Sequence, residues 1–151
     1  MFNNLDKITG VNIDGIIGAS IFKNLVVEID YRREIIIFHD PDFYNGPRSG
    51  FKTFDLQVIK NKPYLKGVTA IGDSDSIGIN LLLDTGASLN YLLHENTHPK
   101  VELPQYIIPG QIGTGLSGSL EGFMGKVNYL QIGDFQFDRL TTSFQNLDSS
   151  I

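Results

Sequence analysis

One acidic residue follows directly on an apolar run, in a setting that suits a catalytic carboxylate. Four of the five residues at 79–83 are Ile or Leu, and the run ends abruptly at Asp84. A carboxylate at the end of a buried strand is costly unless it is hydrogen-bonded or shares a proton. Thr85 and Ser88 offer hydroxyl groups, and Gly86 lets the backbone turn tightly and bring its N–H toward the carboxylate. The same residues also fit an ordinary strand followed by an Asp-initiated turn, and on these residues alone both interpretations stay open.

The segment Leu82-Leu83-Asp84-Thr85-Gly86-Ala87-Ser88 resembles the active-site loop of retropepsin-type and pepsin-type aspartic proteases. That family hydrolyses peptide bonds with two carboxylates that share a proton, one acting as base toward a bound water and the other as acid toward the substrate carbonyl. The resemblance implies that Asp84 is catalytic, with Thr85, Gly86, Ala87 and Ser88 holding it in place. It also implies a peptide or protein substrate, and neither a metal nor an organic cofactor.

Two further segments strengthen this resemblance. Roughly thirty residues after Asp84, the glycine-rich segment resembles the family's flap, a hairpin that closes over substrate; its residues are Ile112, Gly113, Thr114, Gly115, Leu116, Ser117 and Gly118. The six glycines between 110 and 125 favour a mobile hairpin, although a plain flexible loop fits them too. The segment Asp14-Gly15-Ile16-Ile17-Gly18 resembles the apolar-apolar-Gly segment of the family, which implies that Ile16, Ile17 and Gly18 pack beneath the catalytic loop.

The order of these segments departs from the family pattern, in which the apolar-apolar-Gly segment follows the flap. Residues 1–40 are therefore expected to end one lobe, residues 41–50 to link, and residues 51–151 to begin a second lobe, as in tandem-lobed bacterial aspartyl-protease-family proteins. Alternatively, residues 1–40 complete the same lobe in permuted order. Either way there is one Asp-Thr-Gly, so the second carboxylate must come from another lobe or from a second copy across a two-fold axis. A non-catalytic lobe that binds peptide or drives dimerisation stays open as an alternative.

Two other motifs point to different chemistry. His94-Glu95-Asn96-Thr97-His98 spells the zinc-peptidase pattern, which needs both histidines on one helical face and a third ligand such as His39, Glu102 or Glu121. Pro99 disfavours helical geometry at His98, so a solvated loop is the favoured interpretation. The glycines at 113, 115 and 118 also spell a dinucleotide fingerprint, but Gly122 and Gly125 fall where its helix would have to be.

The chain is expected to be all-β. The resemblance implies that its strands form an acid-protease barrel with one short helix. A hairpin is predicted from runs 25–31 and 34–39 around Arg32-Arg33, after a helix within 15–24 whose Ala19, Ile21 and Phe22 face inward. Pro41 and the Asn45-Gly46-Pro47 segment mark a break. Beyond it, strands are predicted at 51–59, 63–71, 77–83, 126–132 and 135–144, with turns at 73–76 and at Gly133-Asp134. Three aromatic residues near the flap segment fit either a cleft or core packing: Tyr106, Phe123 and Tyr129.

The amino-acid composition of the chain limits the kinds of partner and of site that it can have. The net charge of -5 over 151 residues argues against a nucleic-acid partner, because phosphate binding needs a basic face. The absence of cysteine excludes disulfides and cysteine-ligated metals. No apolar run approaches the roughly 20 residues that span a bilayer, and residues 1–6 lack the features of a signal peptide. Two alternatives therefore stay open: the protein is cytosolic, or a targeting segment lies upstream of these residues and directs it to the periplasm or cell envelope.

Overall fold

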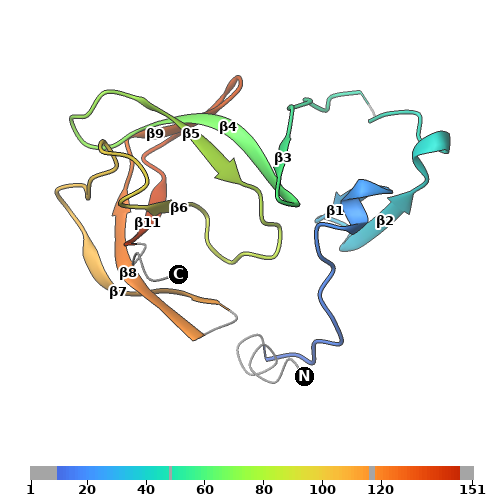
Figure 1. Ribbon diagram of the computed structural model, residues 1–151, viewed down its shortest axis with the longest axis horizontal. Coiled ribbons are helices and arrows are strands. Elements are labelled where there is room, and N and C mark those ends of the chain that lie inside the picture. The colour runs from blue at the N-terminus through green and yellow to red at the C-terminus, as the bar shows by residue number, and fades with distance from the viewer. Residues whose placement is uncertain (1–9, 48, 116–117, 147–151) are drawn as a thin grey trace.

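The computed structural model describes residues 10–47, 49–115 and 118–146, and the regular structure of these residues is almost entirely β-strand (Figure 1). The strands form three open sheets of two, five and four strands. The all-β prediction is therefore confirmed, whereas the strands of the described part close no barrel. The elements in chain order are η1 (Ile21–Lys23), β1 (Val26–Asp30), β2 (Ile35–His39), η2 (Pro41–Phe43), β3 (Gln57–Ile59), β4 (Lys62–Ala70), β5 (Ile77–Leu82), β6 (Leu92–His94), β7 (Ile108–Gly115), β8 (Gly118–Lys126), β9 (Tyr129–Ile132), β10 (Phe135–Asp138) and β11 (Thr141–Gln145).

The predicted N-terminal hairpin is confirmed. Strands β1 and β2 pair antiparallel from Val26 opposite His39 to Asp30 opposite Ile35. At the turn, the Asp30 carboxylate accepts the backbone N–H groups of Arg32 and Arg33, each at 3.0 Å. An Asp side chain that satisfies two turn amides is an efficient local device for reversing the chain. The hairpin stands apart from the two larger sheets (Figure 1).

The short helix expected within 15–24 is reduced to η1, a 3-10 turn of three residues. Ala19 and Ile21 are partly buried, but Phe22 is about half exposed, so the prediction that Phe22 faces inward is wrong. A helix of this length gains its stability from packing rather than from propensity. Because about half of Phe22 remains exposed, packing of this side chain does little to stabilise a longer helix.

The five-stranded sheet is organised around β4. Strands β5 and β9 pair with β4 antiparallel, β3 pairs with its N-terminal end, and β10 follows β9. The predicted two-residue turn between β9 and β10 is confirmed: Gly133 adopts φ +55°, a left-handed conformation that favours glycine. A Cβ atom at Gly133 would also stand 2.7 Å from the Phe54 ring, so both the conformation and the contact require glycine.

The four-stranded sheet has the order β6-β11-β8-β7, with β6 and β11 parallel. The single strand predicted over 135–144 is wrong, because it is two strands in two different sheets. The break lies at Arg139, which adopts φ +51° and donates its backbone N–H to the Asn128 carbonyl at 2.7 Å. This long-range hydrogen bond turns the chain between β10 and β11.

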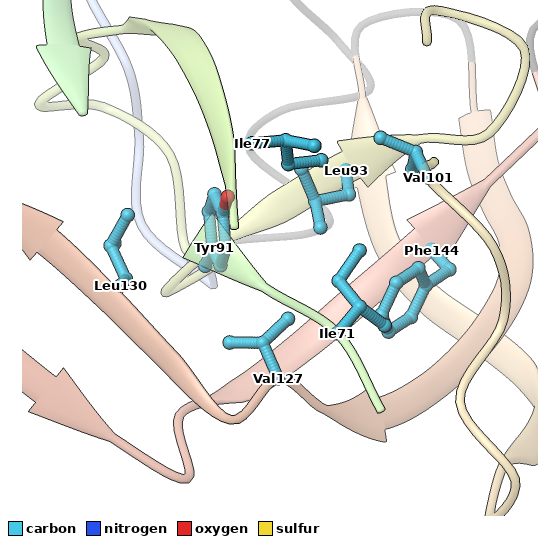
Figure 2. Packing of buried hydrophobic residues seen from close by; sticks show 8 residues of the cluster. All are labelled: Ile71, Ile77, Tyr91, Leu93, Val101, Val127, Leu130 and Phe144. Atoms are coloured by element: carbon cyan, nitrogen blue, oxygen red, sulfur yellow. The ribbon is translucent and has the colours of Figure 1, made fainter. Parts of the chain in front are cut away.

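The main core lies where these two sheets meet (Figure 2). Phe144 and Val127 are almost completely buried, and the other members of the cluster come from both sheets and their connections: Ile71, Ile77, Tyr91, Leu93, Val101 and Leu130. Buried Thr69 donates its hydroxyl to the Tyr129 carbonyl at 2.8 Å, which satisfies its polar group inside the core.

A segment without strands joins the hairpin to the rest of the chain. It runs from Asp40 to Leu56, and the one regular element among its described residues is η2, where the Asp40 side chain accepts the Asp42 N–H at 3.0 Å. The predicted break at 41–50 falls within it. In the described part of the chain, no helix has the length and apolar character that crossing a membrane requires.

Candidate active-site loop and its neighbours

The Asp84 loop begins directly after β5. Strand β5 ends at Leu82, and the Leu83 N–H donates to the Pro63 carbonyl at 3.0 Å, which fixes the point where the chain leaves the sheet. The Gly86 N–H then donates to Asp84 Oδ1 at 2.9 Å, as the sequence predicts. A Cβ atom at position 86 would stand 3.4 Å from that oxygen, an ordinary contact, and Gly86 does not adopt a positive φ, so neither space nor backbone conformation requires glycine at this position.

The loop is more open than the sequence suggests. Residues 84–88 are all exposed, so the expectation of a partly buried carboxylate is not met in the described structure. The physical reason lies in the preceding residues: Leu82 and Leu83 are themselves about half exposed, so the strand delivers Asp84 to the surface rather than to the core. Among the described residues, Ser88 makes no hydrogen bond with Asp84, and the Asp84 carboxylate accepts only the Gly86 N–H.

The glycine-rich segment forms an antiparallel hairpin beside this loop. Strands β7 and β8 pair from Ile108 opposite Met124 to Gly115 opposite Gly118, so the hairpin expected there is confirmed, while Leu116 and Ser117 lie outside the described residues. A Cβ atom at Gly113 would stand 3.3 Å from Cδ2 of Leu89. The hairpin therefore lies directly against the chain that follows the Asp84 loop.

A β-bulge shapes the hairpin near this contact. The register shifts between Gln111 and Gly113, which leaves Ile112 as the extra residue and buries its side chain. The Gln111 side-chain amide donates to the Gly113 carbonyl at 3.2 Å and to the Thr114 hydroxyl at 3.1 Å. These bonds stiffen the base of the predicted flap, whereas its function as a cover for substrate stays a prediction.

The apolar-apolar-Gly segment is not brought to the loop in the described structure. Ile16 and Ile17 are more than half exposed. A Cβ atom at Gly18 would meet no atom within 4 Å. The structure thus brings together the Asp84 loop and the β7–β8 hairpin, while the packing of residues 16–18 beneath the loop stays a prediction.

The zinc-peptidase pattern does not adopt the geometry that this chemistry needs. His94 is the last residue of β6, and the chain turns there, with the Thr97 hydroxyl donating to the His94 carbonyl at 2.6 Å. His98 is exposed and accepts the Lys100 N–H through Nδ1 at 3.1 Å. The two histidines therefore share no helical face, and within the described ranges no three or more His, Asp or Glu side chains gather as metal ligands.

The dinucleotide pattern also lacks its required context. Gly113, Gly115 and Gly118 lie on the two strands of a hairpin, whereas phosphate binding needs a strand that leads into a helix. Of the three aromatic residues near the flap, Phe123 packs against the core and Tyr129 is partly buried in β9. Tyr106 is largely exposed beside β7.

Three buried polar atoms near β6 have no hydrogen-bond partner within the described part of the chain: Tyr91 Oη, His94 Nδ1 and Glu95 Oε1. His94 and Glu95 belong to the zinc-peptidase pattern, whereas Tyr91 does not. Burial raises the pKa of Tyr91 to about 12, with the nearby Thr69 hydroxyl opposing this rise. Burial lowers the pKa of His94. The apolar run Tyr91-Leu92-Leu93 is the local sequence signal that the chain enters the core here, and Tyr91 and Leu93 are both buried.

Comparison of the chain with protein-family models, with curated proteins and with solved structures finds no match.

Proposed function

We propose that this chain carries one catalytic carboxylate of an aspartic-peptidase-type hydrolase, with Asp84 as the acid/base and a peptide or protein as substrate. The observation that carries the proposal is the local geometry of the loop: Asp84 Oδ1 accepts the Gly86 N–H at 2.9 Å, directly after a strand and within a glycine-containing turn. A carboxylate oxygen held by a backbone amide leaves the second oxygen free to bind and polarise a water molecule.

The position of the glycine-rich hairpin supports the same proposal. Its strand β7 contacts Leu89, five residues after Asp84, so a substrate lying over the loop would also lie beside the hairpin. Extended peptides bind well to such hairpins, because backbone N–H and C=O groups can pair with them. In the described part of the chain no second carboxyl group bonds to Asp84, so the proposal requires a further carboxylate from another lobe or another copy.

A direct assay tests this function. We expect cleavage of a mixed peptide library between about pH 3 and 7, strongest where a carboxylate pair holds one shared proton. Asp84→Asn should abolish cleavage, and a statine-type transition-state mimic should block it. Asp55→Asn is the matched control, since Asp55 is exposed and lies before β3, away from the loop in sequence. Cleavage that survives in Asp84→Asn, or cleavage by a species shown to be monomeric, would overturn the assignment.

The exposure of residues 84–88 favours a second candidate, a non-catalytic lobe of the same family type that binds peptide. This candidate predicts that a peptide from the library binds with micromolar affinity but is returned intact. Binding that is unchanged in Asp84→Asn, together with no cleavage at any pH, would select it over the hydrolase.

A further inference from the structure

The chain exposes more surface than a compact monomer of its size. Its accessible surface is 11657 Å². A compact monomer of 16.8 kDa has about 7,700 Å². Even if each of the 17 residues outside the described ranges contributed a fully exposed 160 Å² or so, an excess of about 1,200 Å² would remain. A standard protein interface covers about 800 Å² per partner, so the excess is large enough for a stable one.

Part of this excess is one face of the β1–β2 hairpin. Residues opposite one another in the register point to the same side, which places four apolar side chains on one face: Val27, Ile29, Ile36 and Phe38. Ile36 is 51% exposed and Phe38 is 43% exposed. The other face carries the Glu28–His39 pair at 2.9 Å together with Val26, Ile35 and Ile37, which are partly buried. A two-stranded hairpin is marginally stable at best in water, so this apolar face requires a partner surface.

A second apolar surface, only partly covered, lies on the five-stranded sheet, where the ring of Phe54 lies 6.0 Å from the ring of Phe135. The register places Phe137 opposite Leu130 and Phe135 opposite Ile132, so both phenylalanines point to the side on which the core lies. Leu130 is buried in that core, yet Phe135 and Phe137 are 46% and 47% exposed. The core-facing side of the sheet therefore extends past the four-stranded sheet that covers it.

The segment that connects these two surfaces allows the hairpin to pack away from the five-stranded sheet of its own chain. The described residues of 40–47 and 49–56 form no strand, and nearly all of them are exposed. In the structure β1 and β2 pair only with each other, and the hairpin stands to one side of β3 (Figure 1). Two copies of a chain can exchange elements when a long exposed connection joins an apolar element to a domain that has an uncovered apolar face.

We propose that the apolar face of the β1–β2 hairpin covers the Phe135 and Phe137 face of a second copy of this chain, and that the reciprocal contact closes a two-fold dimer. Both halves of the interface are present in one chain, so two identical contacts form at once and each buries a face that water otherwise meets. The dimer does not depend on Asp84 chemistry.

Sedimentation of the whole chain between about 2 and 100 µM tests the proposal. We expect a dimer, and we expect Phe38→Ser and Phe137→Ser each to raise its dissociation constant at least tenfold. Tyr31→Ser is the matched control: Tyr31 is an exposed aromatic residue in the turn outside the apolar face, and its loss should leave the constant unchanged. Asp84→Asn should dimerise as the unaltered chain does, which separates this test from that of the proposed function. A monomer at every concentration would overturn the proposal.

Cysteine cross-linking identifies which surfaces meet, even if the serine variants fold poorly. The chain has no cysteine, so single substitutions report cleanly. A mixture of Phe38→Cys and Phe137→Cys chains under mild oxidation should give the mixed dimer in excess over both homodimers. Phe38→Cys homodimers as the main product would overturn the exchange in favour of hairpin-to-hairpin contact. An intramolecular disulfide in the dilute double variant would show that the hairpin covers its own sheet, and would overturn it as well.

Discussion

The side chain of Leu89 lies against the backbone of Gly113, where a Cβ atom would stand 3.3 Å from Leu89 Cδ2. Leu89 belongs to the chain that follows the Asp84 loop, and Gly113 belongs to β7. This contact links the chain that follows the candidate catalytic loop to the predicted flap. Movement of the hairpin and the position of the loop are therefore expected to depend on one another.

Leu89→Ala should loosen the β7–β8 hairpin. The substitution removes the side chain on which Gly113 rests, and truncating a half-buried leucine costs about 1–3 kcal/mol. We expect faster amide hydrogen exchange in β7 and β8, with little change in β4 and β9. Leu103→Ala is the control, because Leu103 packs against the main core and its loss should raise exchange across both large sheets. Identical exchange patterns in the two variants would show that Leu89 does not hold the hairpin specifically.

Gly122→Ala should destabilise the four-stranded sheet. A Cβ atom at Gly122 would collide with the Phe144 carbonyl and would stand 3.0 Å from Ile112 Cδ1. Because the obstacle is largely backbone, β8 would have to move away from β11, and overpacking of this kind costs about 1–3 kcal/mol. We expect that loss in chemical denaturation.

Gly78→Ala is the matched control for Gly122→Ala. Gly78 also lies within a strand, but a Cβ atom there meets no atom within 4 Å. Replacing a strand glycine by alanine where space allows stabilises by about 0.5–1 kcal/mol. Equal stability of the two variants would mean that β8 and β11 approach each other less closely than the structure shows.

The parts of the fold that sequence predicts well are those fixed by local hydrogen bonds. The Arg32-Arg33 turn depends on Asp30, and the Gly133-Asp134 turn depends on the conformational freedom of glycine. Both turns can therefore be predicted from a few neighbouring residues. The break at Arg139 is different, because a hydrogen bond to Asn128 imposes a left-handed conformation on a residue that disfavours it. No local pattern contains that long-range contact.

The same distinction applies to the candidate site. The hydrogen bond from Gly86 to Asp84 spans two residues, and the sequence predicts it. The exposure of the loop depends instead on which elements cover it, and Leu82 and Leu83 read as core residues although each is about half exposed. The role of Leu89 cannot be predicted from local sequence, because its contact with Gly113 joins two segments that are distant along the chain.

Tyr91→Phe should protect the protein from alkaline unfolding. Burial raises the pKa of Tyr91 from 10.0 to about 12, so between these values the folded state keeps a proton that the unfolded state loses. Stability should therefore fall as pH rises through that window, by at most about 2.7 kcal/mol and by roughly half of that after solvent screening. Thermal or urea unfolding between pH 8 and 11 measures the loss.

The same Tyr91→Phe variant should be no less stable than the unaltered chain at pH 8, because the buried Tyr91 hydroxyl has no well-formed hydrogen bond within the described residues, and the nearby Thr69 hydroxyl donates to the Tyr129 carbonyl instead. Tyr106→Phe is the control, since Tyr106 is exposed and should show no protection at alkaline pH. A clear destabilisation of Tyr91→Phe at pH 8 would mean that the hydroxyl has a partner in solution.

Zinc should not bind stoichiometrically at His94 and His98. His94 ends a strand and His98 follows in an exposed turn, so the two imidazoles do not share a helical face. Elemental analysis of protein purified without chelator checks this. One zinc per chain that is lost in His94→Ala would contradict the prediction.

His94 should make the protein less stable in acid. Burial lowers the pKa of His94 below its ordinary value of 6.5, so the folded state favours the neutral imidazole. As pH falls through 6.5, the unfolded chain takes up a proton that the folded chain resists. Stability is therefore lost between 6.5 and the lower folded pKa, and no further loss from this group occurs below it.

The His94→Gln variant isolates this effect, because every other titrating group is the same in both proteins. We expect urea denaturation at pH 7.5 and pH 5.0 to show a smaller acid loss in His94→Gln than in the unaltered chain. His98→Gln, which alters an exposed imidazole, should retain the full loss. An equal acid loss in all three proteins would show that His94 protonates freely in the fold. A positive result also has a practical consequence, since His94→Gln would stay folded further into the acidic range where Asp84 chemistry is expected to be strongest.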